Sequence, residues 1–236
     1  MKCCAIIYEA QMEAHPLLQA VPQEKGEYWN KYYASREVLK LSAPSQFAAF
    51  VAQEAGDAHL IIEVGCGNGR DSLFFARHGF QVVAIDGSSA AITKCQDSSK
   101  AQSLSGISFI CSTVGGPGFA DVLRQARAHA EGPALAYARF FLHAITDSEE
   151  LAFFEDMSAA LRDGDRLAVE YRTVRDAAGE KVTAAHYRRF VEPSQVIANA
   201  AKFGFAAEYE VEGFGFAKYL KDDAYVARTV FRKVAA

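Results

Sequence analysis

The stretch IIEVGCGNGRDS at residues 61–72 decides the fold. It begins as an apolar run, continues with Gly65, Gly67 and Gly69 at alternate positions, and leads into an amphipathic segment. Glycine adopts backbone angles that are closed to other residues, and without a Cβ it lets a ligand lie against the main chain. The N–H groups of a first helical turn then face that ligand. The stretch therefore predicts a strand, a tight turn and a helix start that form a pocket for a nucleotide-like cofactor.

Buried strands and amphipathic helices alternate around this stretch. Strands are expected at residues 59–64, 81–85, 107–111, 134–138 and 166–172, and helices at 71–77, 90–101, 119–130, 147–161 and 193–203. This β-α order with short connections indicates a parallel sheet with right-handed crossovers. Two helices, one from Glu27 and one over 45–55, are predicted ahead of it. Two final strands, 206–212 and 225–232, are expected to pair as a hairpin, and the polar stretch 173–186 is predicted to be a surface loop.

Composition indicates one soluble globular domain over residues 1–236, with a lead-in and lid helices at 1–56 and the core at 57–236. Half of the 236 residues are apolar and 23% are charged. The net charge of −4 argues against broad nucleic-acid binding. The five cysteines show neither paired nor metal-ligand spacing, so we expect no metal site and a cytoplasmic protein. No apolar run is long enough to span a membrane.

The spacing of the glycines separates two classes of cofactor. Dinucleotide enzymes carry G-x-G-x-x-G, and here Arg70 stands at the place of the last glycine. The observed E-x-G-x-G-x-G pattern resembles the first motif of the class I S-adenosylmethionine-dependent methyltransferases. That resemblance implies an α/β fold with a single Rossmann-like seven-stranded sheet, mostly parallel with the last strand antiparallel, flanked by helices and an N-terminal helical lid. It also implies S-adenosyl-L-methionine as the cofactor.

A second acidic residue supports this cofactor. Asp86 ends the second strand, 17 residues after Gly69, where a carboxylate can accept hydrogen bonds from both ribose hydroxyls. A helix cap or turn aspartate is the structural alternative. Where relatives often have an acidic or amide side chain for the adenine, this chain has Cys111-Ser112-Thr113-Val114. The predicted cofactor-binding residues are Trp29, Tyr33, Arg36, Glu63, Gly65, Cys66, Gly67, Asn68, Gly69, Asp71, Asp86, Gly87, Ser88, Ser112 and Arg139. Arg36 or Arg139 would hold the methionine carboxylate, and the aromatic residues would close a lid.

The acceptor side is predicted from the ends of later strands. Residues 138–143 read ARFFLH and lack the Asn/Asp-Pro-Pro-Tyr motif of relatives that methylate nitrogen, so nitrogen methylation is disfavoured. Arg139 and His143 are the candidate catalytic residues, with His143 as a general base or, alternatively, a structural histidine. The candidate substrate-binding residues are Tyr171, Arg172, Tyr187, Arg188 and Arg189. Arginines with interleaved tyrosines favour a sugar, carboxylate or phosphate.

We therefore predict methyl transfer from S-adenosyl-L-methionine to an oxygen of a sugar, glycan, phosphate or other small polar acceptor. The segments YARFFLHAI and HYRRF also show a weaker resemblance to bacterial glycan and small-metabolite O-methyltransferases. A methyltransferase that detoxifies thiols, chalcogens or other small molecules is one alternative. A non-catalytic protein that binds S-adenosylmethionine as a scaffold is another, and a dinucleotide oxidoreductase is the third.

Overall fold

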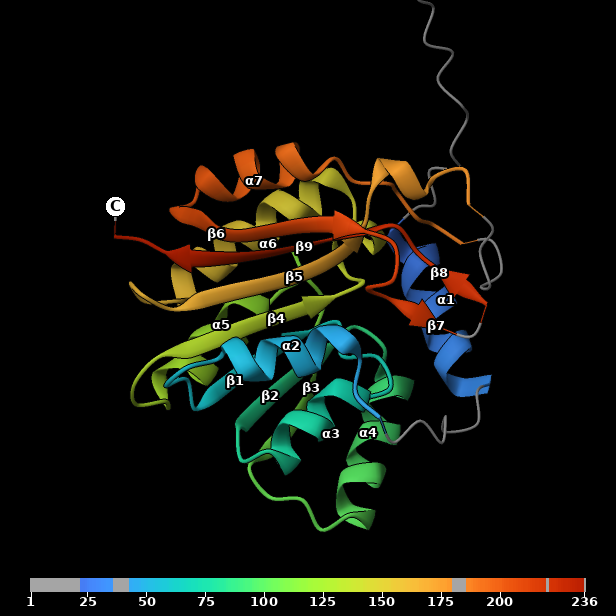
Figure 1. Cartoon of the computed structure of the whole chain (residues 1–236). Helices are drawn as coiled ribbons and strands as arrows, with labels where there is room; N and C mark the ends of the chain where they lie inside the picture. Colours follow the sequence, from blue (N-terminus) through green and yellow to red (C-terminus); the bar gives the residue numbers. More distant parts are fainter. Residues whose placement is uncertain (1–21, 36–42, 180–185, 220, 236) are drawn as a thin grey trace, which may run out of the picture.

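The computed structural model describes residues 22–35, 43–179, 186–219 and 221–235. Strands and helices alternate along this part of the chain (Figure 1). The helices are α1 (Pro22–Ser35), α2 (Gln46–Glu54), α3 (Arg70–Arg77), α4 (Ser89–Ala101), α5 (Phe119–Ala128), α6 (Asp147–Ala160) and α7 (Pro193–Ala201), with short 3-10 turns η1 (Leu142–Ala144) and η2 (Val174–Asp176). The strands are β1 (Leu60–Val64), β2 (Gln81–Asp86), β3 (Ile107–Cys111), β4 (Ala134–Arg139), β5 (Arg166–Arg172), β6 (Phe205–Gly213), β7 (Lys218–Tyr219), β8 (Asp222–Asp223) and β9 (Val226–Lys233).

Within the described residues the main sheet has seven strands in the order β3-β2-β1-β4-β5-β9-β6. β1 to β5 pair in parallel, and β9 runs antiparallel to both of its neighbours. The strand order reverses direction at β1 and β4, and ligands of open α/β sheets bind beyond the carboxyl ends of the strands at such a point. The predicted Rossmann-like fold class is confirmed.

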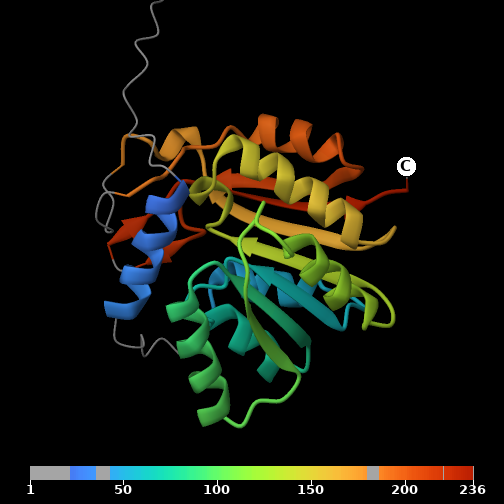
Figure 2. The same cartoon turned by 180° about the vertical axis from the view of Figure 1, so that it is seen from behind.

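Apolar side chains cover both faces of the sheet, as a parallel sheet requires. Phe47, Phe75 and Cys95, from α2, α3 and α4, belong to the core on one face. Phe119 and Phe153, from α5 and α6, belong to the core on the other face, together with residues of α7. Figure 1 shows the α2–α3 side of the sheet, and Figure 2 shows the α5–α6–α7 side. Because helices pack on both faces of the sheet, the ends of the strands are the part of the sheet that is left for a ligand.

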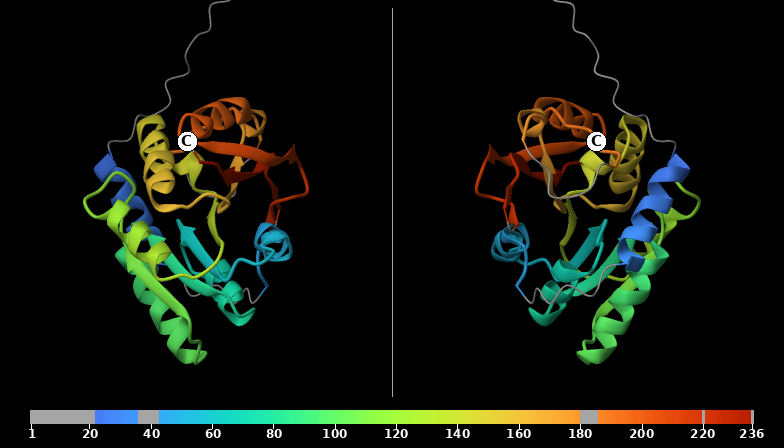
Figure 3. Two further views of the ribbon diagram at one scale, coloured as in Figure 1. Left: turned by 90° about the vertical axis from the view of Figure 1, so that its left-hand side faces the viewer. Right: turned by 90° about the vertical axis from the view of Figure 1, so that its right-hand side faces the viewer.

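Two elements lie beyond the carboxyl ends of the parallel strands. α1 stands against α4, as Figures 2 and 3 show, and the β7–β8 hairpin lies nearby in Figure 1. α1 begins at Pro22, five residues before the predicted start at Glu27, and ends at Ser35 within the described residues. The rest of that predicted helix and the lead-in 1–21 lie outside the described residues. No helix of the described part is long and apolar enough to cross a membrane.

Two expectations for the second half of the chain need correction. β6 and β9 pair as predicted, but the chain between them is more than a turn, because it contains the separate β7–β8 hairpin. The stretch after β5 is also not simply a surface loop. Thr173 and Asp176 are buried, and Thr173 forms a bridge with Val191. Residues 180–185 of that stretch lie outside the described residues. Polar composition misled the prediction, because buried ion pairs and hydrogen bonds satisfy these side chains.

Candidate active site

A cavity of about 480 Å³ opens at the carboxyl ends of β1, β2, β4 and β5. The glycine-rich loop, the end of β2 and the segment after β3 form one end of it. Residues after β4 and β5, the segment 186–188 and the β7–β8 hairpin form the other end, and α1 covers both. A volume of this size suits a small-molecule ligand or cofactor. Residues of both predicted sets, though not all of them, therefore meet in one cavity.

The glycine-rich loop has the backbone form that its sequence predicts. Gly65, Gly67 and Gly69 have φ angles of 76°, 55° and 71°, in the left-handed region that favours glycine. A Cβ on Gly65 would lie 2.7 Å from Cδ2 of Phe141, and one on Gly67 would overlap the Tyr33 hydroxyl. Gly65 and Gly67 line the cavity, as do Cys66 and Asn68. Gly69 instead ends the loop as the N-cap residue of α3.

Asp86 fastens this loop to the next strand. Its Oδ2 accepts a hydrogen bond from the N–H of Gly67 at 2.8 Å, and its Oδ1 accepts one from the N–H of Ser88 at 2.8 Å. Burial raises the pKa of Asp86 above its usual value, although the bonds from Ser88 and Gly67 oppose the shift. The carboxylate lines the cavity together with Gly87 and Ser88, and Ser112 from beyond β3 lines the same end.

The lid helix α1 is docked over the loop. The Tyr33 side chain lies against Gly67, and burial raises its pKa well above the usual value for tyrosine. Trp29 also lines the cavity. Asn30 Oδ1 accepts hydrogen bonds from Ser88 Oγ at 2.8 Å and from the N–H of Ala90 at 3.2 Å. The other predicted lid residue, Arg36, lies outside the described residues.

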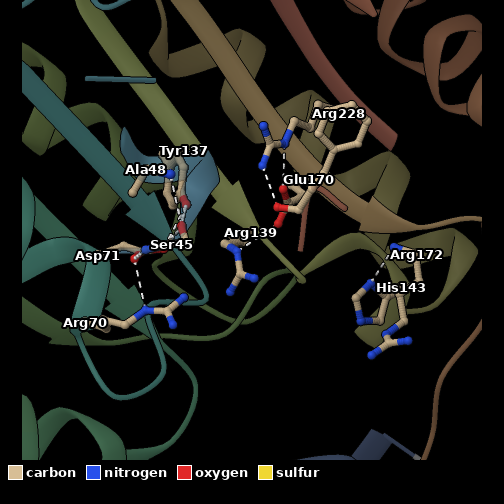
Figure 4. Close-up of polar contacts among 11 residues, drawn as sticks. Ser45, Ala48, Arg70, Asp71, Tyr137, Arg139, His143, Glu170, Arg172 and Arg228 are labelled. Carbon is tan, nitrogen blue, oxygen red and sulfur yellow. Dashed lines mark hydrogen bonds and ion pairs between the residues drawn. The ribbon is translucent and has the colours of Figure 1, made fainter. Parts of the chain in front are cut away.

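Asp71 is the centre of a buried hydrogen-bond cluster beneath the loop (Figure 4). Its carboxylate accepts from the N–H of Ser45 at 2.8 Å, from Ser45 Oγ at 2.7 Å and from the Tyr137 hydroxyl at 2.9 Å, and it pairs with Arg70. Burial acts to raise the pKa of Asp71, but Arg139, Arg70 and the Ser45 bonds outweigh it and lower the pKa. The carboxylate therefore stays ionised inside the protein.

Glu63 is a second buried acid beside this cluster, and it behaves differently. Burial and the nearby Asp71 charge raise the pKa of Glu63 well above its usual range, and the hydrogen bond from Ser72 opposes them only in part. Glu63 lines the cavity at the end of β1. Protonation makes it a hydrogen-bond donor as well as an acceptor.

Arg139 is held in place by a buried acid that the sequence did not suggest. Its Nε donates to Glu170 Oε1 at 2.8 Å, and the other oxygen of Glu170 accepts from Arg228 Nε at 2.8 Å (Figure 4). The Glu170 side chain is fully buried, and that of Arg139 is 19% exposed. The two terminal nitrogens of Arg139 make no hydrogen bond to any other described residue. These two nitrogens present N–H donors side by side in the cavity, a geometry that suits a carboxylate.

His143 lies in η1 and is 5% exposed. Its Nδ1 accepts a hydrogen bond from the backbone N–H of Arg172 at 3.1 Å (Figure 4). Burial and the charges of Arg172 and Arg188 lower the pKa of His143 well below its usual value. The imidazole is therefore neutral and lines the cavity. Its role as a general base stays a prediction. In this arrangement Nδ1 already accepts a hydrogen bond, so it is not available to take a proton from an acceptor.

Only part of the predicted substrate set lines the cavity. Arg172 and Arg188 do, and Arg172 forms ion pairs with Asp176 at 2.6 Å and Asp222 at 2.5 Å. Tyr171 does not, because it is fully buried in the core on the other face of the sheet. Tyr187 lies beneath the Lys25 ammonium outside the cavity lining. Arg189 is likewise absent from the lining, because it pairs with Asp147 and Glu150 of α6.

Comparisons with known proteins agree with this geometry. Residues 61–164 match the model of a family described as a methyltransferase domain. This stretch of the chain is thus similar to methyltransferase domains. A search of curated protein sequences finds no match.

Solved structures share the fold of this chain at low sequence identity. One comes from work on the conversion of a disulfide bond into a thioacetal group during echinomycin biosynthesis, with a TM-score of 0.69 and 16% identity over 89% of this chain and 92% of that one. A methyltransferase from Anabaena variabilis gives a TM-score of 0.66 and 18% identity over 88% and 93%. The magnesium protoporphyrin IX methyltransferase of Synechocystis, with bound S-adenosylhomocysteine, gives 0.62 and 13% identity over 89% and 99%.

The cavity fits S-adenosyl-L-methionine, the cofactor that the sequence predicts. Gly65 and Gly67 line the cavity with backbone alone, the Asp86 carboxylate can accept hydrogen bonds, and the terminal nitrogens of Arg139 can donate them. Within the described residues no group of three His, Cys, Asp or Glu side chains could hold a metal ion. The cavity thus offers separate partners for hydroxyl groups and for a carboxylate.

Proposed function

We propose that this methyltransferase transfers the methyl group of S-adenosylmethionine to an oxygen of a small polar acceptor, such as a sugar, a glycan or a phosphate. The observation that carries the proposal is the order of polar groups along the sheet edge. Asp86 ends β2, the glycine-rich loop follows β1, Arg139 ends β4, and Arg172 ends β5. Donor and acceptor sites would then occupy successive parts of one cavity.

In this arrangement the Asp86 carboxylate accepts hydrogen bonds from the ribose hydroxyls, and Ser112 lies toward the adenine. The free nitrogens of Arg139 bind the methionine carboxylate as a bidentate pair. Glu63 and the carbonyl of Gly65 line the same cavity and would accept hydrogen bonds from the amine. Support for the Arg139 assignment comes from charge: among the described residues, Arg70, Arg139 and Arg228 share two ion-pair partners, Asp71 and Glu170. One further anion balances the cluster.

When bound, the cofactor supplies an activated methyl group on a sulfonium. The protein's share is to align the acceptor oxygen with the methyl group and to exclude water. α1 covers the cavity with Trp29 and Tyr33, and Lys25 of the same helix pairs with Glu149 of α6 at 2.5 Å. These contacts make the helix suited to exclude solvent while the methyl group moves.

Calorimetric titration with S-adenosylhomocysteine and with 5′-methylthioadenosine tests the cofactor assignment. The second compound lacks the amino-acid portion, so it does not report on a carboxylate contact. Arg139→Ala should weaken S-adenosylhomocysteine roughly 10- to 100-fold, the value of a charged hydrogen bond, and leave 5′-methylthioadenosine unchanged. Arg124→Ala, an exposed arginine of α5, is the matched control. Equal losses for both compounds would contradict the role of Arg139, and no binding to the native protein would remove the cofactor site.

A sulfur-directed methyltransferase is the second candidate. The structural neighbour from echinomycin biosynthesis acts in sulfur chemistry, and its fold resembles this one closely. A screen with labelled methyl donor against paired alcohols and thiols separates the two candidates. Bound cofactor without transfer to any acceptor would instead favour a scaffold protein.

A further inference from the structure

The acceptor end of the cavity, by which we mean Phe140, His143, Arg172, His186, Arg188 and the β7–β8 hairpin, is rich in hydrogen-bond donors. Methylation of a neutral hydroxyl or amine releases a proton, so such an acceptor needs a base with an available lone pair. The hydrogen bonds at the acceptor end show which groups still have an available lone pair.

His143 has no lone pair to offer. A neutral imidazole has one acceptor nitrogen and one N–H. Nδ1 accepts the N–H of Arg172 at 3.1 Å, and a backbone N–H has no other role than donor. Nε2 therefore carries the hydrogen. Phe140 packs against the ring with centroids 5.2 Å apart, which fixes its orientation. His143 presents a donor to the cavity.

The other candidate bases of this end are also engaged: His186 by hydrogen bonds, and the carboxylates by ion pairs that protonation would break. His186 Nε2 lies 3.3 Å from Nη2 of Arg188, which can only donate, and Nδ1 lies 3.2 Å from the Tyr28 hydroxyl. Asp222 is paired with Arg172 at 2.5 Å. Farther along the cavity, Glu149 is paired with Lys25. Among the described residues that line this end, every histidine and carboxylate already holds a donor.

We propose that the acceptor is a carboxylic acid, bound as its carboxylate, with the Nε2–H of His143 donating to it. This inference rests on the proposed function and narrows its acceptor to an acidic oxygen. A carboxylate is already a nucleophile at neutral pH, so it needs no base. N–H groups of imidazole and guanidinium match an oxygen anion better than a thiolate, which is a weak hydrogen-bond acceptor.

The step is balanced without a proton acceptor. A lone pair of the carboxylate oxygen forms a bond to the methyl carbon while the bond from that carbon to sulfur breaks. Its electron pair stays on the sulfur, which becomes a neutral thioether. The products are a methyl ester and S-adenosylhomocysteine, and no proton is released.

Molecules that carry two kinds of acceptor test the choice directly. Glucuronate and 4-hydroxybenzoate offer a hydroxyl and a carboxylate, and 3-mercaptopropionate offers a thiol and a carboxylate. The enzyme is incubated with each and with S-adenosylmethionine labelled in the methyl group, and the product is treated with alkali. We expect label released as volatile methanol, which identifies an ester.

Alkali-stable ether would overturn this inference and leave the proposed oxygen methylation standing. Alkali-stable thioether would overturn the inference in favour of the sulfur-directed alternative. No transfer to any of the three probes, with S-adenosylhomocysteine still bound, would overturn the inference and the proposed function together.

Variants of His143 distinguish a donor from a base. Glutamine places an N–H group near the position of Nε2 but cannot act as a base. His143→Gln should keep kcat within about 10-fold, whereas His143→Ala should raise KM for the carboxylate roughly 10- to 100-fold. His129→Gln, an exposed histidine beyond α5, is the control. Equal collapse of kcat in the Gln and Ala variants, with unchanged KM and with thermal stability near that of the native enzyme, would show a base and overturn the inference.

Discussion

The side chain of Asp86 and the backbone of Gly67 are joined by a hydrogen bond of 2.8 Å between Oδ2 and the N–H. Gly67 belongs to the loop after β1, and Asp86 ends β2, so the bond holds the loop against the neighbouring strand. The same carboxylate lines the cavity. One side chain therefore holds the glycine-rich loop in place and also faces the cavity.

Replacement of Asp86 is expected to affect binding strongly. Asp86→Ala should weaken S-adenosylhomocysteine roughly 10- to 100-fold by calorimetry, because a charged acceptor and the anchor of the loop are lost together. The affinity of Asp86→Asn should lie between those of the native protein and Asp86→Ala, because asparagine keeps one acceptor oxygen. Asp57→Ala, an exposed acid, serves as control. Undiminished binding by Asp86→Ala would rule out the assignment.

Gly67 is expected to tolerate no side chain while Tyr33 keeps its hydroxyl. In Gly67→Ala the new Cβ overlaps that hydroxyl and the residue sits at a φ of 55°, so affinity for S-adenosylhomocysteine should fall. Tyr33→Phe removes the overlapping atom. A double-mutant cycle should give a coupling of about 1 kcal/mol, with Gly67→Ala less harmful in the Phe background. Strict additivity of the two changes would contradict the contact.

Glu63 is expected to make the protein less stable as the pH rises. Its pKa is raised on folding, so the native state holds a proton that the unfolded state releases. The free energy of unfolding should fall from about pH 4.3, the ordinary glutamate value, upward toward the raised pKa, by at most about 1.4 kcal/mol per pH unit. Glu63→Gln should remove this slope and stabilise the protein at pH 7.

Urea denaturation at pH 5, 6, 7 and 8, without cofactor, measures this effect. Glu54→Gln, an exposed glutamate at the end of α2, is the control. A Glu63→Gln variant with the same pH slope as the native protein would show that Glu63 is ionised when buried.

Asn30 is expected to control how fast the cofactor leaves. Its Oδ1 joins α1 to the first turn of α4 through Ser88 and Ala90, so Asn30→Ala should loosen the lid. The dissociation rate of S-adenosylhomocysteine should rise about 5- to 10-fold, with little change in Tm. Trp29 is the only tryptophan and lines the cavity, which makes its fluorescence a stopped-flow signal. Lys31→Ala on the same helix should leave the rate unchanged, and an unaltered rate in Asn30→Ala would dismiss this docking role.

The strands were the most predictable part of the molecule. β3 and β5 have the predicted bounds. A short apolar run between glycines and polar turns is too short for a helix and is typical of a buried strand. The glycine spacing and Asp86 were also predictable from sequence. A backbone that approaches a ligand closely accepts few residue types, so such positions form a recognisable pattern. The hairpin β7–β8 was not, because its strands are two residues long and carry no apolar pattern.

Side-chain partners across long sequence separations were not predictable. Glu170 and Arg228 are charged residues on interior strands, and only the pairing of β5 with β9 brings them together. The assignment of Tyr171 to the substrate site failed for a simpler reason. Neighbouring residues of a strand point to opposite faces, so Tyr171 enters the core while Glu170 and Arg172 lie on the other side. Alternation within β5 was the signal that could have corrected it.

The β7–β8 hairpin belongs to one end of the cavity only, and it follows the residues of the other end by about a hundred positions in the chain. Arg228 donates to the carbonyl of Phe216 at 2.8 Å, and Arg172 pairs with Asp222, so the hairpin is pinned to the core at two points. The loop and strand ends near the cofactor come from residues 63–114, far from it in sequence. If the proposed function holds, an exchange of the hairpin strands at residues 218–219 and 222–223, by evolution or in a chimera, is expected to change the selected acceptor and to leave the methyl-donor site intact.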